Sequence, residues 1–203
     1  MILNKVTIIK QLSGLAAEFG IEFGDEILSQ AVDISQFKVF QKGVTLKHIG
    51  DNAKTVGIVL EGLVRSYYID TDGNDITRGF GMAGSMCMDE GMMGYSEHIC
   101  MWETIEESTL MLFEVSKLKS LIFGSEKMKS IWIGLLEGGL RYKMYRENGF
   151  LVENATERYL HFRKLYPQLI GRIPQKHIAT YLGIKPESLS RIRSALKEEV
   201  PEI

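Results

Sequence analysis

The residues that most clearly suggest chemistry lie near the end of the chain, in the segment IPQKHIATYLGIKPESLSRIRSAL. Its apolar residues recur at spacings of three and four on both sides of Gly183, which predicts two short helices around a glycine turn. The other face of the second helix carries Glu187, Ser188 and Arg191, residue types that hydrogen-bond base edges and phosphates. The segment therefore predicts a helix-turn-helix that reads DNA.

The alternative is a plain two-helix hairpin whose polar face is simply solvated. The charge distribution argues against that alternative. Residues 156–203 contain nine Lys and Arg against five Asp and Glu, a net charge of +4, whereas residues 1–155 have a net charge of −6. A basic C-terminal segment joined to an acidic one is typical of a small DNA-binding domain attached to a regulatory domain.

Composition narrows the class of protein. The chain has 203 residues, of which 45% are hydrophobic and 25% are charged, the profile of a soluble globular protein. No apolar run approaches the roughly 20 residues of a membrane span. The N-terminus, MILNKVTIIKQL, has no secretory signal pattern. We therefore expect a cytoplasmic protein without a membrane partner.

The chain has two cysteines, Cys87 and Cys100, and four scattered histidines. Two cysteines are too few for a four-cysteine iron–sulfur cluster or zinc site within one chain. A reducing compartment favours free thiols over a disulfide, although a redox switch between them is an alternative. The histidines show no metal-ligand spacing. We therefore expect no metal and no cofactor.

After one or two short helices in residues 1–30, the pattern changes to short strands punctuated by glycines. The pair Asp72-Gly73, between YYID and DITRGF, is a strong hairpin signal. Many short strands at regular spacing favour a sandwich or barrel. The predicted strands are 37–41, 44–49, 56–60, 64–69, 76–82, 101–105 and 109–115.

A long helix is predicted from Ser125, a plausible N-cap, to about residue 148. Apolar residues recur along this helix at spacings of three or four. They could pack on the barrel of the same chain or on the same helix of a second subunit, and we expect packing between subunits. A hinge at 149–153 and a helix at 155–166 follow. The predicted dimer-helix residues are Met128, Ile131, Leu135, Gly139, Tyr142 and Tyr145.

This order of parts resembles the Crp/Fnr family of bacterial transcription regulators, in particular the branch found in Bacteroidetes-type bacteria. The strongest local matches are IVLEGLVRSYYIDTDGND and ATERYLHFRKLYPQLIGRIPQKHIATYLGIKPESLSRIRSAL, and the resemblance covers nearly the whole chain. It implies an α+β fold. Residues 1–124 would form a double-stranded β-helix like a cyclic-nucleotide-binding β-roll, 125–150 a dimerisation helix and hinge, and 151–203 the helix-turn-helix domain.

On this resemblance the protein is not an enzyme. It is a homodimer that binds a near-palindromic operator and acts with RNA polymerase. Pro186 stands where many members carry an arginine, so one base contact is absent. Residues 198–203 are too few for the wing hairpin, which we expect to be reduced or absent. The implied base-reading residues are Glu187, Ser188 and Arg191, and the implied phosphate contacts are Lys176, Lys185 and Arg193.

The resemblance also implies an effector pocket inside the roll. Members that bind cyclic nucleotide neutralise its phosphate with an arginine. Here no arginine or lysine lies between Arg78 and Lys117, so we expect no binding of cyclic AMP. The region is rich in methionine, which fits either a packed pocket or an unknown apolar or uncharged small-molecule effector. The candidate pocket residues are Met86, Met88, Asp89, Glu90 and Met101.

Two rival functions remain open at this point. One is a small-molecule-binding protein whose C-terminal domain no longer acts on DNA. The acidic residues Glu198, Glu199 and Glu202 near the second helix favour this alternative. The other is a cupin-like enzyme. Cupin chemistry needs a His/Glu metal cluster, and the lone His48 and His98 do not supply a histidine pair at ligand spacing.

Overall fold

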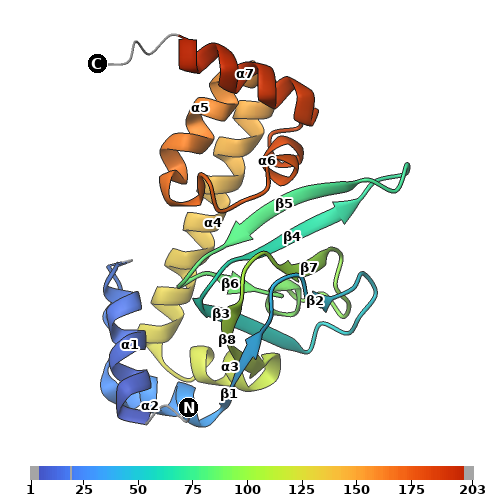
Figure 1. The fold of residues 1–203 in the computed structure, drawn as a ribbon. Helices are drawn as coiled ribbons and strands as arrows, with labels where there is room; N and C mark the ends of the chain where they lie inside the picture. Colours follow the sequence, from blue (N-terminus) through green and yellow to red (C-terminus); the bar gives the residue numbers. More distant parts are fainter. Residues whose placement is uncertain (1–4, 19, 199–203) are drawn as a thin grey trace. The chain divides into compact units, whose positions relative to one another are not determined.

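Two antiparallel four-stranded sheets form the strand-rich part of the chain (Figure 1). Their strand orders are β1-β8-β3-β6 and β2-β7-β4-β5, so the chain crosses repeatedly between the sheets. The computed structural model describes residues 5–18 and 20–198. The strands are β1 (Ser35–Phe40), β2 (Thr45–Lys47), β3 (Thr55–Glu61), β4 (Val64–Ile69), β5 (Asp75–Gly81), β6 (Met86–Cys87), β7 (Met101–Thr104) and β8 (Ser108–Glu114).

Gly62, between β3 and β4, shows why this turn needs glycine. Its φ of +90° is a left-handed conformation that side chains rarely adopt. A Cβ at this position would also lie 2.3 Å from the carbonyl oxygen of Glu107. The two strands can therefore be joined closely against the start of β8 because residue 62 has no side chain.

The chain divides into two compact units, Met1–Tyr67 with Gly79–Leu135, and Tyr68–Arg78 with Leu136–Ile203. The first unit contains the roll with α1 (Lys5–Glu18), α2 (Asp25–Asp33), the 3-10 helix η1 (Glu90–Met93), α3 (Val115–Phe123) and the start of α4 (Glu126–Val152). The tip of the β4–β5 hairpin belongs to the second unit.

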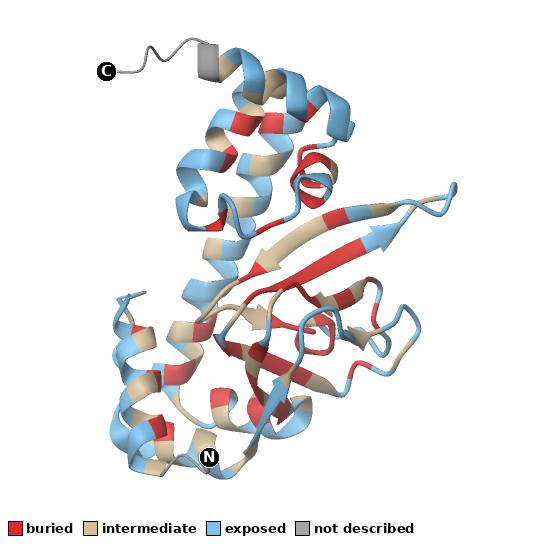
Figure 2. Ribbon diagram, in the orientation of Figure 1, coloured by how far each residue is buried: buried red, intermediate tan, exposed pale blue. Residues whose placement is uncertain are grey.

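Two buried clusters hold the first unit together, and Figure 2 shows the buried positions running along the strands. Successive side chains of a strand point to opposite sides, so β3 presents Val56 and Leu60 to one cluster and Val59 to the other. The inner cluster comprises Val59, Val64, Cys87, Met88, Cys100, Trp102 and Leu110. The second cluster joins the roll to the surrounding helices and includes Ile8, Leu12, Leu28, Val56, Phe113, Leu118, Met128 and Trp132.

The long helix α4 runs through the predicted hinge and ends at Val152. Ser125 lies just before its start, and the backbone N–H of Met128 donates to the Ser125 hydroxyl at 3.5 Å. The break comes at Asn154, whose side chain accepts from two backbone N–H groups of the next helix in a capping box with Glu157. This capping box stops α4 and starts α5 (Ala155–Leu165).

The second unit adds η2 (Pro167–Leu169), α6 (Gln175–Tyr181) and α7 (Pro186–Glu198). Aromatic side chains form much of its core. The ring of Phe162 lies 5.4 Å from that of Tyr166 and 5.3 Å from that of Tyr181. The elements confirm the predicted α+β class, with a β-roll, a long helix and a C-terminal helix-turn-helix. The short strand β6 and η1 were not predicted.

Candidate functional site

The helix-turn-helix is formed by α6 and α7, which are joined at Gly183 (Figure 1). Gly183 has a φ of +68°, and a Cβ on it would lie 2.9 Å from a ring carbon of Phe150. The N–H of Ile184 donates to the carbonyl of Ala179 at 3.0 Å, and Ala179 itself is fully buried. The predicted arrangement of two helices around a glycine turn is therefore present.

Helix α7 has a buried side and an exposed side. Leu189 has no exposed surface, and Ile192 and Leu196, three and seven residues later, are half-buried. This spacing turns the polar residues of the helix outward. The exposed side chains include the three predicted base-reading residues, Glu187, Ser188 and Arg191.

The predicted phosphate-contacting residues are close in sequence to the exposed residues of α7. Lys176 at the start of α6 and Lys185 before α7 are exposed, whereas Arg193 is half-buried. The tail in which a wing would have to form, residues 199–203, lies outside the described residues. The absence of a wing therefore stays a prediction.

Three of the six predicted dimer-helix residues, Met128, Ile131 and Tyr142, are buried or half-buried within the chain. Met128 and Ile131 pack into the second cluster of the first unit. The hydroxyl of Tyr142 lies 2.6 Å from that of Tyr181, and the ring of Tyr145 lies 5.8 Å from that of His161. The other three predicted positions are exposed, with Leu135 at 46%, Tyr145 at 42% and Gly139 also at the surface.

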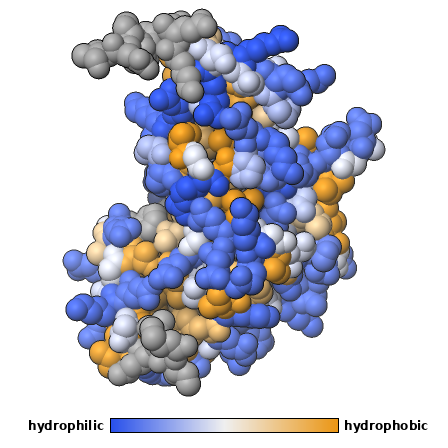
Figure 3. Space-filling view, in the orientation of Figure 1, coloured by the Kyte–Doolittle hydropathy of each residue, from blue (hydrophilic) through white to orange (hydrophobic). Residues whose placement is uncertain are grey.

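A different apolar stripe of α4 is left exposed. At about 3.6 residues per turn its members share one line along the helix, on the side opposite to Met128 and Tyr142. Apolar side chains reach the surface in several places in the space-filling view (Figure 3). The stripe consists of Ile133 (55% exposed), Leu136 (40%), Leu140 (60%), Met144 (60%) and Leu151 (78%). The predicted dimer face stays a prediction, and this stripe is a second candidate for the surface that a copy of the helix would cover.

Inside the roll, the carboxylate of Glu90 is the centre of a buried hydrogen-bond network. Glu90 is 2% exposed. One of its oxygens lies 2.8 Å from Nδ1 of His98, and the other accepts from the Cys100 thiol at 2.8 Å. The indole N–H of Trp102 donates to both oxygens at 3.2 Å. The carboxylate is thus satisfied by side chains of its own chain.

This network lowers the pKa of the Glu90 carboxyl group. Burial alone would raise the pKa of Glu90, but the hydrogen bonds from His98, Cys100 and Trp102 outweigh it and lower the pKa to about 2. A buried carboxylate that stays ionised must keep its donors, since an unpaired one is costly. The network is therefore a fixed part of the folded roll.

The sequence-based reasoning found Glu90 but missed its donors. His98, Cys100 and Trp102 alternate along the segment that leads into β7, so their side chains point to the same side. That period of two was the available signal. Nε2 of His98 is buried and has no hydrogen-bond partner among the described residues.

The other candidate pocket residues do not all meet at this network. Met88 lies in the inner cluster with two donors of Glu90, Cys100 and Trp102, in a left-handed conformation with a φ of 54°. Met86 instead packs against the second cluster. The sulfur of Met101 accepts from the backbone N–H of Ile49 at 3.4 Å, and Asp89 is half-buried beside η1.

Both cysteines are free thiols and fully buried. Burial, with the nearby carboxylates of Asp89 and Glu90, raises the pKa of Cys87 far above its usual range. A thiol must ionise to react, so Cys87 is a poor nucleophile in the folded state. Within residues 5–18 and 20–198 no group of three or more His, Cys, Asp or Glu side chains is arranged to hold a metal ion.

One buried cation of the roll lies outside the segment considered in the sequence. Arg65 on β4 is 1% exposed, and its Nε lies 2.8 Å from a carboxylate oxygen of Glu103. Its guanidinium also lies 4.1 Å from the ring centroid of Tyr67. Alternation along β4 directs Arg65 away from the side of Val64, which lies in the inner cluster. Arg65 therefore does not supply a cation to the interior network.

We predict that Glu90→Gln destabilises the protein at pH 7 by up to roughly 3 kcal/mol. The folded pKa is lowered, so the ionised form stabilises the fold above the unfolded value of about 4.5. That contribution is lost as the pH falls toward about 2. Urea unfolding at several pH values should therefore show the difference between the wild type and Glu90→Gln shrinking over this window. Glu97→Gln, at an exposed carboxylate, controls for the loss of one charge, and a deficit equal at pH 7 and pH 3 would contradict the prediction.

Comparison with known proteins shows which domain and which proteins this chain resembles. Residues 37–125 match the cyclic nucleotide-binding domain. The fumarate and nitrate reduction regulatory protein of Escherichia coli (strain K12) is 25% identical over 173 residues, covering 78% of this chain and 68% of that protein. The described residues include no helix that is both long enough and apolar enough to span a membrane.

Solved structures share the fold. FixK2 from Bradyrhizobium japonicum aligns with a TM-score of 0.73 at 21% identity, over 82% of this chain and 86% of FixK2. The catabolite activator protein of Thermus thermophilus aligns with a TM-score of 0.56 at 22% identity, over 87% and 85% of the two chains. With a roll, a long helix and a helix-turn-helix in this order, the chain is a homologue of the Crp/Fnr regulators that carries a cyclic nucleotide-binding domain at residues 37–125.

Proposed function

We propose that the protein is a sequence-specific DNA-binding transcription regulator of the Crp/Fnr type and not an enzyme. The observation that carries this proposal is the two-sided character of α7, which buries Leu189 and exposes Glu187, Ser188 and Arg191. A solvated hairpin would not need an arginine and a glutamate on one exposed side beside exposed lysines. The homology to a regulatory protein that covers 78% of this chain supports the same function.

In the proposed complex α7 enters the major groove. Arg191 would bind guanine through its two-pronged guanidinium, and Glu187 would accept from a cytosine amine. Lys176, Lys185 and Arg193 would contact phosphates and so set the position of α7 without reading sequence. RNA polymerase is the further partner that this function implies.

The proposed active form is a homodimer on a near-palindromic operator. The exposed stripe of α4, from Ile133 to Leu151, supplies apolar surface that a second copy of the helix would cover. Two recognition helices related by a two-fold axis would read half-sites about one DNA turn (roughly 34 Å) apart. The stripe and the exposed predicted positions Leu135, Gly139 and Tyr145 are the surfaces of α4 open to such a pairing.

We further propose that the roll does not bind cyclic AMP. The Glu90 carboxylate, which could have accepted from a ribose hydroxyl, is engaged by His98, Cys100 and Trp102. No arginine or lysine lies between Arg78 and Lys117 to neutralise a cyclic phosphate, and Arg65 pairs with Glu103. An anionic ligand would therefore meet a buried carboxylate without a compensating cation.

We predict that Arg191→Ala weakens binding to the cognate operator by about 1–3 kcal/mol and relaxes the preference at one base pair. The loss follows from removing a bidentate contact to one base. Fluorescence anisotropy on operator variants with single base changes measures both effects. Ser190→Ala, at an exposed position of α7 outside the predicted base-reading residues, is the matched control. An Arg191→Ala protein with unchanged affinity and preference would rule out the assignment.

Leu140→Glu is predicted to convert the dimer into a monomer and to weaken operator binding by more than tenfold, because it buries a charge at the centre of the α4 stripe. Light scattering after gel filtration gives the mass. Lys127→Glu introduces the same side chain at an exposed position of α4 away from the stripe and should leave the mass unchanged. A Leu140→Glu protein that remains dimeric would exclude the stripe as the interface.

Titration calorimetry with cyclic AMP is predicted to give no binding heat at micromolar ligand, because residues 79–116 hold no arginine or lysine for the phosphate and the buried Arg65 is paired with Glu103. Operator affinity should likewise be the same with and without the nucleotide. Measurable affinity, or an operator affinity that changes with cyclic AMP, would overturn the proposal for the roll while leaving DNA binding intact.

A further inference from the structure

Helix α6 ends in backbone carbonyls that its own backbone cannot satisfy. The last carbonyls of any α-helix lack intrahelical donors, and α6 has seven residues, so these carbonyls are a large share of its length. Two arginine side chains supply donors. The Tyr181 carbonyl accepts from Nη2 of Arg146 at 3.0 Å, and the Leu182 carbonyl accepts from Nε of Arg158 at 3.1 Å.

Each of these arginines also binds a second backbone carbonyl. Nη1 of Arg146, on α4, donates to the carbonyl of Arg78 in the β4–β5 hairpin at 2.5 Å. Nη1 of Arg158, on α5, donates to the carbonyl of Glu153 at the end of α4 at 2.6 Å. One guanidinium therefore ties α6 to the hairpin tip, and the other ties it to the junction of α4 and α5. All these contacts lie within the second unit.

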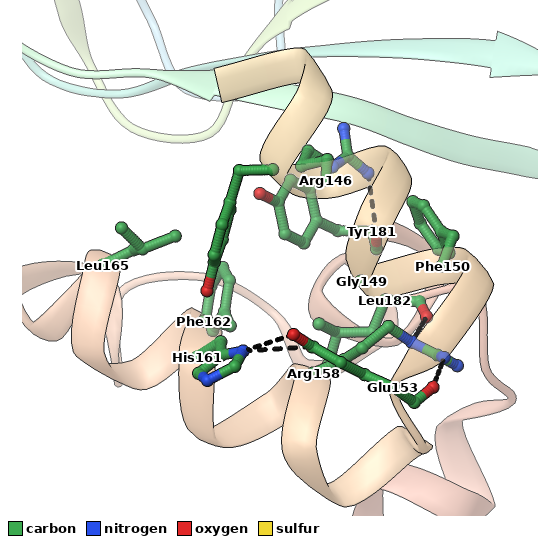
Figure 4. A pocket seen from close by; sticks show the side chains of 11 residues that line it. Arg146, Gly149, Phe150, Glu153, Arg158, His161, Phe162, Leu165, Tyr181 and Leu182 are labelled. Carbon is green, nitrogen blue, oxygen red and sulfur yellow. Dashed lines mark hydrogen bonds and ion pairs between the residues drawn. The ribbon is translucent and has the colours of Figure 1, made fainter. Parts of the chain in front are cut away.

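The ring of Phe150 completes the arrangement (Figure 4). The guanidinium groups of Arg146 and Arg158 lie 5.3 Å and 5.6 Å from its centroid. The same ring lies so close to Gly183 that a Cβ there would approach it to 2.9 Å. We call Arg146, Phe150 and Arg158 the turn cradle, because together they contact the three consecutive residues 181–183.

These three consecutive residues lead directly into α7. The direction in which α7 leaves the turn depends on where Tyr181, Leu182 and Gly183 are held. A second hydrogen-bond pair fixes the same helix end to the hairpin, since the hydroxyls of Thr77 and Thr180 lie 2.8 Å apart. The turn cradle therefore sets the orientation of α7 by holding the residues that precede it.

We infer that Arg146 and Arg158 are positioning residues for DNA reading, which act by holding the turn and not by touching DNA. This inference rests on the proposed function of α7. Both side chains are half-buried, and their donors are engaged with protein carbonyls. A residue used in this way contributes to affinity through pre-organisation of the binding surface.

The geometry requires arginine in particular. A guanidinium is a planar fork that can donate to two acceptors in fixed directions, whereas a lysine ammonium is a point charge on a flexible chain. Arg146→Lys and Arg158→Lys therefore keep the net charge and the long-range attraction to DNA, but lose the double carbonyl contact. These variants separate positioning from charge.

The test measures operator affinity as a function of salt for Arg146→Lys and Arg158→Lys. We expect each to bind about tenfold more weakly, with the slope of log affinity against log salt unchanged, because no phosphate contact is lost. Lys185→Ala is the contrasting variant and should reduce that slope by about one phosphate contact. Arg141→Lys, at an exposed position on α4, is the matched control and should bind like the wild type.

Hydrogen exchange without DNA gives a second readout. The amides of Gly183 and Ile184 donate to Thr180 and Ala179 within the turn, and we expect them to exchange about tenfold faster in both lysine variants but not in Arg141→Lys. An equal global unfolding midpoint shows that the turn alone has loosened.

Three results would overturn the inference. They are wild-type operator affinity in both lysine variants, a salt slope reduced as in Lys185→Ala, which would make the arginines direct DNA contacts, or unchanged exchange at the turn. A wild-type protein that binds no DNA would instead refute the proposed function, and the inference with it. Faster exchange in the lysine variants would then still show that the arginines hold the turn.

Discussion

The complete burial of Leu189 is the constraint on which the proposed DNA-reading surface depends. Because successive turns of a helix repeat at about 3.6 residues, one fully buried position fixes which residues of α7 face outward. Those residues include Glu187, Ser188 and Arg191, the types that read base edges. A buried leucine, however, leaves the direction of the helix undetermined. The bonds from Arg146 and Arg158 to the carbonyls of α6 supply that second constraint.

In the roll, the buried hydrogen-bond network is centred on an anion. The interior of the roll holds a carboxylate, Glu90, and the fold surrounds it with three donors from a short stretch of the same chain. In a ligand-binding roll a carboxylate at the pocket would be free to accept from the ligand. Here the donors are internal, so the roll can be stable without an effector. The two units therefore use charged side chains differently: two arginines bind backbone carbonyls at the turn after α6, and one carboxylate is buried inside the roll.

Local periodicity allowed much of this fold to be predicted. The strand at residues 64–69 and the helices around Gly183 were found because their patterns are contained in a few consecutive residues. The side of α4 that a second subunit would cover could not be settled from the sequence, because α4 carries apolar residues on two sides and periodicity does not say which side the rest of the chain covers. Met128 is covered and Leu140 is not. The donors of Glu90 and the carbonyl partners of Arg146 and Arg158 were missed because they join residues from separate elements.

Selection of bound DNA from a random pool measures whether this chain reads DNA and which sequence it prefers. We expect enrichment of a near-palindrome whose half-sites are centred about one DNA turn apart, with binding that weakens steeply as salt increases. Recovered sequences that do not differ from the starting pool, at a salt concentration where the protein is folded, would contradict the claim that this chain reads DNA.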